Sequence, residues 1–280
     1  MRSSLALALT AALLPAAAPA QEGSWAFTDV AVVVPDREEV LEGRTVAVED
    51  GIITAVGEAG AVDLPDPVRI IPGEGRFLMP GLAEMHAHVP PVPDPDQELL
   101  EDYLFLYVAN GITTIRGMLG QDYQIELAHR LERNELLGPT FYVGAPSLNG
   151  TSAPDPAAAK RLVRAHAGAG YDLQKIHPGV SRETWDHMVE VAHEVALTFG
   201  GHVPADVGLV HALETGMSTV DHLDGYVQAV ADDDVVAQIN SGADISLEGL
   251  VEGVGEAGID EIVALSLESD IYVVPTLYLW

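Results

Sequence analysis

The sequence predicts an α/β protein: a (β/α)₈ barrel of the TIM type, preceded by a small antiparallel β-sandwich portion. Residues 21–78 contain short β-branched runs separated by tight turns. Residues 79–280 instead alternate apolar, strand-like runs with amphipathic helical stretches. Repeated strand–helix units imply a parallel sheet, and this number of units favours a barrel over a doubly wound sheet. No glycine-rich phosphate loop follows any predicted strand, which argues against a nucleotide-binding fold.

Residues 1–20 are predicted to be a secretory signal peptide. Arg2 supplies a positive charge, residues 5–14 form an apolar run, and Ala18-Pro19-Ala20 provides a small-residue cleavage site before Gln21. The apolar run is about ten residues long, whereas a membrane-spanning helix needs roughly twenty. We therefore expect a periplasmic or secreted protein without a membrane anchor after signal removal.

Residues 21–78 are predicted to be the N-terminal part of the β-sandwich. Strand-like runs lie at residues 30–34, 45–49, 52–56 and 68–71. Asp50 and Gly51 separate the second run from the third, and an Asp-Gly pair in that position is the strongest short-range signal for a β-hairpin. This unit is too short to form a stable sandwich by itself.

Residues 79–280 are predicted to form the barrel. Strand candidates are residues 82–88, 112–116, 140–143, 173–177, 200–203, 219–222, 245–247 and 271–277. Amphipathic helical segments are residues 121–137, 156–168, 182–199 and 207–216. The last apolar run stops without a terminal helix, and the segment is at the bottom of the size range of about 200–400 residues for such barrels. We therefore expect a C-terminally truncated barrel that lacks at least its last β/α unit.

The composition narrows the kinds of partner. There are 43 acidic and 13 basic residues, and the formal net charge is −30. Such a surface repels polyanions, so we expect a small-molecule substrate rather than nucleic acid or an anionic membrane. The chain has no cysteine, so any metal must be held by His, Asp, Glu or a modified Lys. The sequence leaves open whether the chain forms a homo-oligomer.

Five ligand-type residues follow the strand repeat. His86 and His88 are two apart on one predicted strand, so both imidazoles share a face and can hold one cation. Lys175 lies toward the carboxyl end of an apolar strand, where burial favours the neutral amine, which can react with carbon dioxide to form a carbamate. His202 and His222 end the next two predicted strands. A lone histidine pair or a strand-end lysine also occurs without such a role, but five residues in phase favour a shared site.

The order His-x-His, Lys, His, His on the first, fourth, fifth and sixth predicted strands resembles the amidohydrolase superfamily of metal-dependent hydrolases, and is closest to its imidazolonepropionase and prolidase-like branch. The segment Phe77-Leu78-Met79-Pro80-Gly81-Leu82 resembles the point where that family's β-sandwich leads into its barrel. The likeness covers roughly residues 25–280 and is specific to the superfamily rather than to a substrate.

The resemblance implies two divalent metal ions, with zinc the best match to nitrogen and oxygen ligands. His86 and His88 would bind one ion, His202 and His222 the other, and carboxylated Lys175 would bridge them together with a hydroxide. The family also has an acid–base Asp at the end of strand eight, which we expect beyond the end of this chain, so no catalytic residue is assigned. Asp221 is not expected to replace it, because the neighbour of His222 should point to the opposite face of the strand.

Three further residues are candidates for substrate binding. Arg116 ends the second predicted strand and could bind a substrate carboxylate or form an ion pair at the barrel mouth. His177 shares a strand face with Lys175 and could contact substrate, orient the bridge or be solvated. Tyr278 is the weakest of the three.

The expected function is hydrolysis of an amide-type C–N bond, in a cyclic amide or a dipeptide-like substrate, by a metal-bridging hydroxide. One alternative is a lactonase or organophosphate esterase of the same superfamily. The other is a non-catalytic metal-binding fragment. The sequence does not reveal the substrate, because loops determine specificity in barrels.

Overall fold

The computed structural model describes residues 23–90, 92, 94–241 and 245–277. The predicted signal peptide therefore lies outside the described residues. The chain divides into two compact units between Pro80 and Gly81. Within the described part of the chain, no helix is long and apolar enough to span a membrane.

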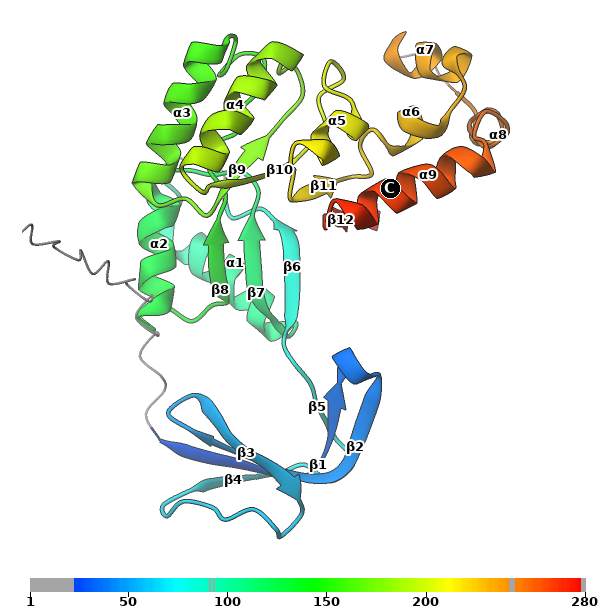
Figure 1. The fold of residues 1–280 in the computed structure, drawn as a ribbon. Helices are drawn as coiled ribbons and strands as arrows, with labels where there is room; N and C mark the ends of the chain where they lie inside the picture. The colour runs from blue at the N-terminus through cyan, green and yellow to red at the C-terminus, as the bar shows by residue number, and fades with distance from the viewer. Residues whose placement is uncertain (1–22, 91, 93, 242–244, 278–280) are drawn as a thin grey trace, which may run out of the picture. The chain divides into compact units, whose positions relative to one another are not determined.

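The first unit contains a single five-stranded mixed sheet (Figure 1). Its strands are β1 (Ser24–Val34), β2 (Glu39–Glu49), β3 (Ile52–Glu58), β4 (Arg69–Pro72) and β5 (Phe77–Leu78), with a 3₁₀ turn at Pro35–Arg37. The predicted hairpin joins β2 to β3, and both turn residues have positive φ, 48° at Asp50 and 80° at Gly51. The expectation of a purely antiparallel unit is wrong, because β4 and β5 pair with β1 in parallel after the chain crosses over from β3.

The second unit contains two parallel sheets. Their strands are β6 (Leu82–Ala87), β7 (Ile112–Gly117), β8 (Thr140–Val143), β9 (Leu173–Ile176), β10 (Thr198–Gly201), β11 (Thr219–Asp221) and β12 (Tyr272–Val274). Strands β6, β7 and β8 form one sheet in that order, and β9 to β12 form the other. Two isolated parallel bridges, Gly144 to Leu173 and Leu148 to Ile176, link the segment after β8 to β9. The described strands therefore neighbour one another in chain order, all in the same direction.

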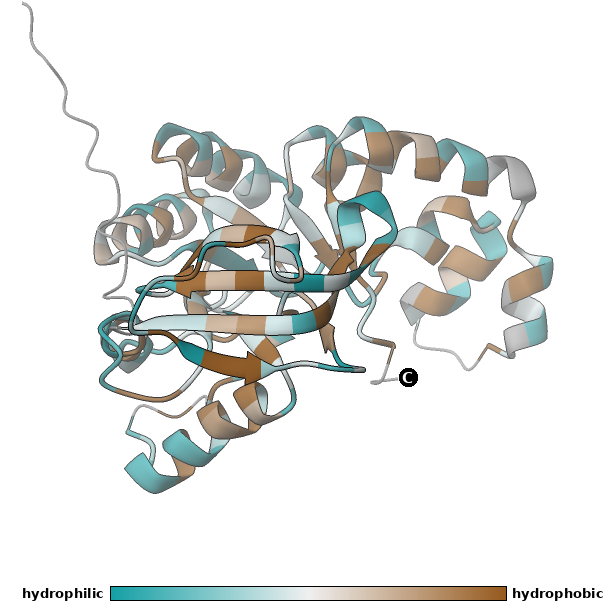
Figure 2. Ribbon diagram, turned by 90° about the horizontal axis from the view of Figure 1, so that it is seen from below, coloured by the Kyte–Doolittle hydropathy of each residue, from teal (hydrophilic) through white to brown (hydrophobic). Residues whose placement is uncertain are grey.

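Helices separate the strands of this unit. They are α1 (Gln97–Ala109), α2 (Tyr123–Glu132), α3 (Pro156–Ala169), α4 (Arg182–Glu194), α5 (Leu209–Glu214), α6 (Tyr226–Val230), α7 (Asp233–Ser241), α8 (Leu247–Glu252) and α9 (Glu256–Glu268). Figure 2 shows apolar and polar residues alternating along them. The side chains of Asp155 and Ser181 accept hydrogen bonds at the starts of α3 and α4, and Gly170 ends α3 at a φ of 93°.

The predicted strand at residues 245–247 is wrong. The side chain of Ser246 accepts a hydrogen bond from the backbone N–H of Gly249, and α8 begins at the next residue. A short apolar run suits a strand and a buried helix equally well, so the capping serine decides between them.

Two apolar clusters support the second unit. One lies between β6–β8 and helices α1 and α2, and includes Leu104 and Ile115. The larger cluster lies against β9, β10 and β11, where the rings of Trp185 and Phe199 pack edge to face with centroids 5.6 Å apart. Helices α3 and α4 lie side by side in this region (Figure 1). These clusters hold the strand ends that carry the ligand-type residues.

Candidate metal centre

The structure brings the five predicted ligand residues into one cavity. His86 lies on β6 and His88 directly after it, Lys175 lies on β9, and His202 and His222 directly follow β10 and β11. Because parallel neighbouring strands end at the same edge, their terminal side chains converge. The cavity has a volume of about 740 Å³. Its wall also contains Glu84, Met118, His177, Thr276 and Leu277.

The imidazole rings form a continuous group. The ring centroid of His222 lies 4.6 Å from that of His86 and 4.7 Å from that of His202. His88 stacks on His86 with centroids 5.2 Å apart. Burial lowers the pKa of His88 and of His222, and the nearby His86 adds to both shifts. Both rings are therefore held as neutral imidazoles, the form that binds metal ions.

Hydrogen bonds at Nδ1 fix the ring orientation of two of these histidines. The Nδ1 atom of His202 lies 2.7 Å from Oδ2 of Asp224, and that of His222 lies 2.7 Å from Oγ1 of Thr276. A carboxylate only accepts, so Nδ1 of His202 carries the hydrogen. The Thr276 hydroxyl donates its one hydrogen to the Pro275 carbonyl, so it accepts the hydrogen bond from Nδ1 of His222. In both rings the lone pair is therefore on Nε2.

Lys175 is almost completely buried, with 1% of its surface exposed. Its Nζ atom donates to Oδ2 of Asp221 at 3.1 Å. Burial lowers the pKa of Lys175, and the charge of Asp221 opposes this shift only in part. The side chain passes over Gly201, where an added Cβ would lie 2.8 Å from Nζ. The site therefore needs a glycine at this point of β10.

The sequence-based expectation for the side chain of Asp221 is wrong. Asp221 was expected to point away from the site, but its side chain is fully buried and Oδ2 also lies 2.8 Å from Nδ1 of His86. The strand ends at Asp221 and His222 has a φ of 61°, so the alternation of faces stops between them. Burial would raise the pKa of Asp221, but the hydrogen bond from His86 and the charge of Lys175 outweigh it and hold this pKa below its usual value. One carboxylate oxygen of Asp221 and one ring nitrogen each of His86 and His222 lie within 4.8 Å of one another.

The three candidates for substrate binding have different outcomes. Arg116 is not in the cavity wall; it is buried behind it, with Nε donating to the Met85 carbonyl at 2.9 Å and Nη2 lying 3.7 Å from Asp221. This geometry matches the ion-pair alternative rather than recognition of a substrate carboxylate. His177 does line the cavity and stacks on His202, with centroids 4.8 Å apart. Tyr278 lies outside the described residues.

The neutral state of His177 follows from its surroundings. Burial, together with the nearby Lys175 and His202, lowers the pKa of His177 to about 4. The ring is therefore uncharged near neutral pH and offers one donor and one acceptor nitrogen.

Sequence reasoning missed three residues of this region. Asp224 and Thr276 lie in connecting segments, and no local pattern marks them as partners of a histidine. Glu84 lines the cavity and its Oε1 accepts from the backbone N–H of His86 at 2.8 Å. The spacing of two between Glu84, His86 and His88 is the signal that could have revealed it.

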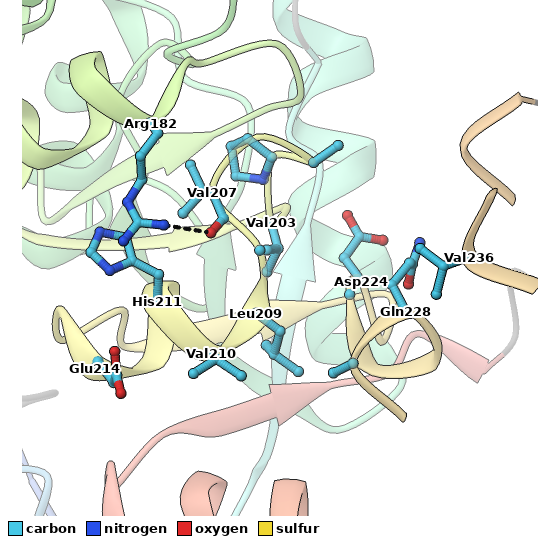
Figure 3. A pocket seen from close by; sticks show the side chains of 15 residues that line it. Arg182, Val203, Val207, Leu209, Val210, His211, Glu214, Asp224, Gln228 and Val236 are labelled. Carbon is cyan, nitrogen blue, oxygen red and sulfur yellow. Dashed lines mark hydrogen bonds between the residues drawn. The ribbon is translucent and has the colours of Figure 1, made fainter. Parts of the chain in front are cut away.

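A second cavity, of about 570 Å³, lies beside the segments that follow β10 and β11 (Figure 3). Its wall contains Arg182, which donates to the Val207 carbonyl at 3.4 Å, and His211. Asp224, which contacts His202, also contributes to this wall. None of the five predicted ligands lines it, and the first cavity is therefore the candidate centre.

No protein-family model matches the chain. Adenine deaminase 3 of Rhizobium meliloti (strain 1021) is 24% identical over 247 residues, which cover 79% of this chain and 40% of that protein. An adenine deaminase of Paracoccus denitrificans (strain Pd 1222) is 27% identical over 66% of this chain and 33% of its own length. The chain thus spans less than half the length of these curated relatives.

Solved structures match most of the chain. A molinate hydrolase has a TM-score of 0.65 and 14% identity, covering 91% of this chain and 73% of its own. A Xaa-Pro dipeptidase has a TM-score of 0.60 and 14% identity, covering 90% and 78%. These matches show that the chain has the α/β fold, with parallel sheets, of these hydrolases. Together with the sequence relatives, these similarities support, at low identity, the resemblance to the amidohydrolase superfamily that the motifs predict.

The glycine beneath Lys175 provides a test of this geometry. Gly201 has a φ of 121°, and an added Cβ would lie 2.7 Å from the Ile176 carbonyl oxygen. We expect Gly201→Ala to lower the free energy of unfolding by about 1–3 kcal/mol or more, because an L residue is strained at this φ. Gly168→Ala, at an uncrowded position in α3, is the control and should be neutral or stabilising by roughly 0.5–1 kcal/mol. Urea unfolding of both variants measures this, and equal stabilities would contradict the described packing.

Proposed function

We propose that this chain is a metal-dependent hydrolase that cleaves an amide-type C–N bond in a cyclic amide or a dipeptide-like substrate. The observation that carries the proposal is the convergence of the four predicted ligand imidazoles and one buried lysine on a single cavity. The relatives named adenine deaminase and the structural neighbour named Xaa-Pro dipeptidase support this class of reaction.

We also propose that β6 to β12 are consecutive strands of a (β/α)₈ barrel. Parallel pairing in chain order supports this, as do the two bridges that connect the two sheets. In such barrels the active site lies at the carboxyl ends of the strands, which is where the ligand-type residues of this chain are found.

The residues of the cavity fit a pair of divalent ions, for which zinc is the best candidate. We propose that His86 and His88 bind one ion, that His202 and His222 bind the other, and that carboxylated Lys175 bridges them. The free Nε2 atoms of His202 and His222 support this assignment, as does the neutral state of His88. When bound, such ions polarise a carbonyl group and lower the pKa of a water molecule.

Other side chains would act on the substrate directly. A volume of about 740 Å³ is large enough for a dipeptide-sized molecule. Neutral His177 can donate to, or accept from, a polar group of the substrate while it stacks on His202. Leu277 and Met118 supply apolar wall that limits water in the cavity. The proposed roles are therefore orientation of the substrate by His177 and partial dehydration by the apolar wall.

Lys175 is the residue whose loss should matter most for metal binding. We expect the wild type to bind about two zinc ions per chain, and Lys175→Ala to lose most of them. The loss should exceed the roughly 10–100-fold in affinity that removal of an outer partner of a metal ligand costs. Lys160→Ala removes the other lysine, which pairs with Glu190 on the helix surface, and is the matched control. Metal analysis after dialysis measures the zinc content of both variants. NMR with ¹³C-bicarbonate should show a carbamate signal in Lys160→Ala but not in Lys175→Ala.

The class of substrate requires an activity measurement. We expect zinc-loaded protein to hydrolyse members of a panel of N-acyl amino acids, Xaa-Pro dipeptides and cyclic ureides, and Lys175→Ala to lose this activity. Hydrolysis of lactones or phosphotriesters alone would replace the proposal with the esterase alternative. Two bound ions without turnover of any compound would favour a non-catalytic metal-binding protein.

We further propose that the protein is exported to the periplasm or the medium. The charge, apolar run and small-residue site within residues 1–20 support this. Mass spectrometry of the exported protein should find Gln21 at its N-terminus. A protein that keeps Met1 and stays in the cytoplasm would contradict this proposal.

A further inference from the structure

Asp221 contacts two of the proposed metal ligands from behind the cavity. Its Oδ2 atom lies 2.8 Å from Nδ1 of His86 and 3.1 Å from Nζ of Lys175. The carboxylate is fully buried and is not part of the cavity wall. It therefore acts on whatever occupies the cavity through the residues that it holds.

The other oxygen of this carboxylate faces Arg116. Oδ1 of Asp221 lies 3.7 Å from Nη2 of Arg116, and within the described part of the chain neither atom has a hydrogen-bond partner. The guanidinium is anchored at its other side, where Nε donates to the Met85 carbonyl of β6. Arg116 thus supplies a fixed positive charge beside a buried negative one.

These contacts join the two parallel sheets at the site. Asp221 and Lys175 lie on β11 and β9 of one sheet, whereas His86 and Arg116 lie on β6 and β7 of the other. A single carboxylate can therefore fix the relative positions of ligands that come from separate sheets.

The donor and acceptor roles in each contact determine which atoms of His86 and Lys175 face Asp221. A carboxylate only accepts, so His86 carries its hydrogen on Nδ1 and its lone pair on Nε2. A lysine carbamate keeps one N–H, which can still donate to Oδ2 of Asp221 and thereby direct the two carbamate oxygens away from the carboxylate. Both effects present ligand atoms to the cavity.

We propose that Asp221, backed by Arg116, is a positioning residue that sets the ring orientation of His86 and the direction of the Lys175 side chain for metal binding. This inference rests on the proposed function, because it concerns ligands of the same centre. It adds a pair of residues that neither the strand-end pattern nor the cavity wall identifies.

Asp221→Asn tests the proposal, since an amide keeps the size of the side chain but has only one accepting oxygen. Its NH₂ group must face either Arg116 or the donors of His86 and Lys175, so one set of contacts is lost. We expect cobalt(II) to bind the variant about 10–100-fold more weakly than the wild type, with an altered visible spectrum that reports changed coordination.

The matched control is Asp186→Asn. Asp186 also pairs with a histidine, His211, and with an arginine, Arg182, but on the surface of α4 and away from the cavity. The substitution removes the same charge, but at a residue whose partners are not proposed metal ligands. We therefore expect the cobalt affinity and the visible spectrum to stay those of the wild type. Thermal unfolding of each variant shows whether it is folded under the titration conditions.

The outcomes separate this inference from the proposed function. If the wild type binds cobalt and Asp221→Asn shows the same affinity and spectrum, the positioning role is wrong and the metal centre stands. If the wild type binds no cobalt, the metal centre itself is wrong. Should Asp221→Asn fail to fold, Arg116→Gln decides: it keeps the carboxylate, and we expect a several-fold weaker affinity with a shifted spectrum, whereas wild-type behaviour would overturn the role of the pair.

Discussion

The parallel pairing of β6 to β12 is the constraint on which the candidate metal centre depends. Strands that run in one direction all end at the same edge, so side chains that are far apart in the sequence meet there without any contact between their own segments. His86, Lys175, His202 and His222 occupy this edge. The apolar clusters beneath the sheets hold the strands in register, and the site inherits its geometry from that packing.

The same packing makes the polar residues behind the site costly unless they are paired. A buried charge without a partner costs several kcal/mol, and Lys175, Asp221 and Arg116 are all buried. The Asp221 carboxylate lies between the Lys175 nitrogen and the Arg116 guanidinium. A set of apolar residues could fill this volume at less cost, so the charged set is better explained by the ligands that it orients than by stability.

Sequence reasoning located the five proposed ligands because each one ends an apolar run in phase with the strand–helix repeat. It misplaced Asp221 because alternation holds only while the backbone stays extended, and the positive φ of His222 is not visible in the sequence. It missed Asp224 and Thr276 because their positions depend on the path of connecting segments over the strand ends. It assigned residues 245–247 to a strand because a run of three apolar or small residues carries no period. Local patterns thus reveal strands and their ends, whereas the partners of the ligands come from tertiary packing.

Anomalous X-ray diffraction from crystals grown with zinc, with data collected on both sides of the zinc absorption edge, tests the proposed two-ion centre directly. We expect two anomalous peaks inside the cavity, one beside His86 and His88 and the other beside His202 and His222. Peaks confined to surface histidines such as His187, with none inside the cavity, would contradict it.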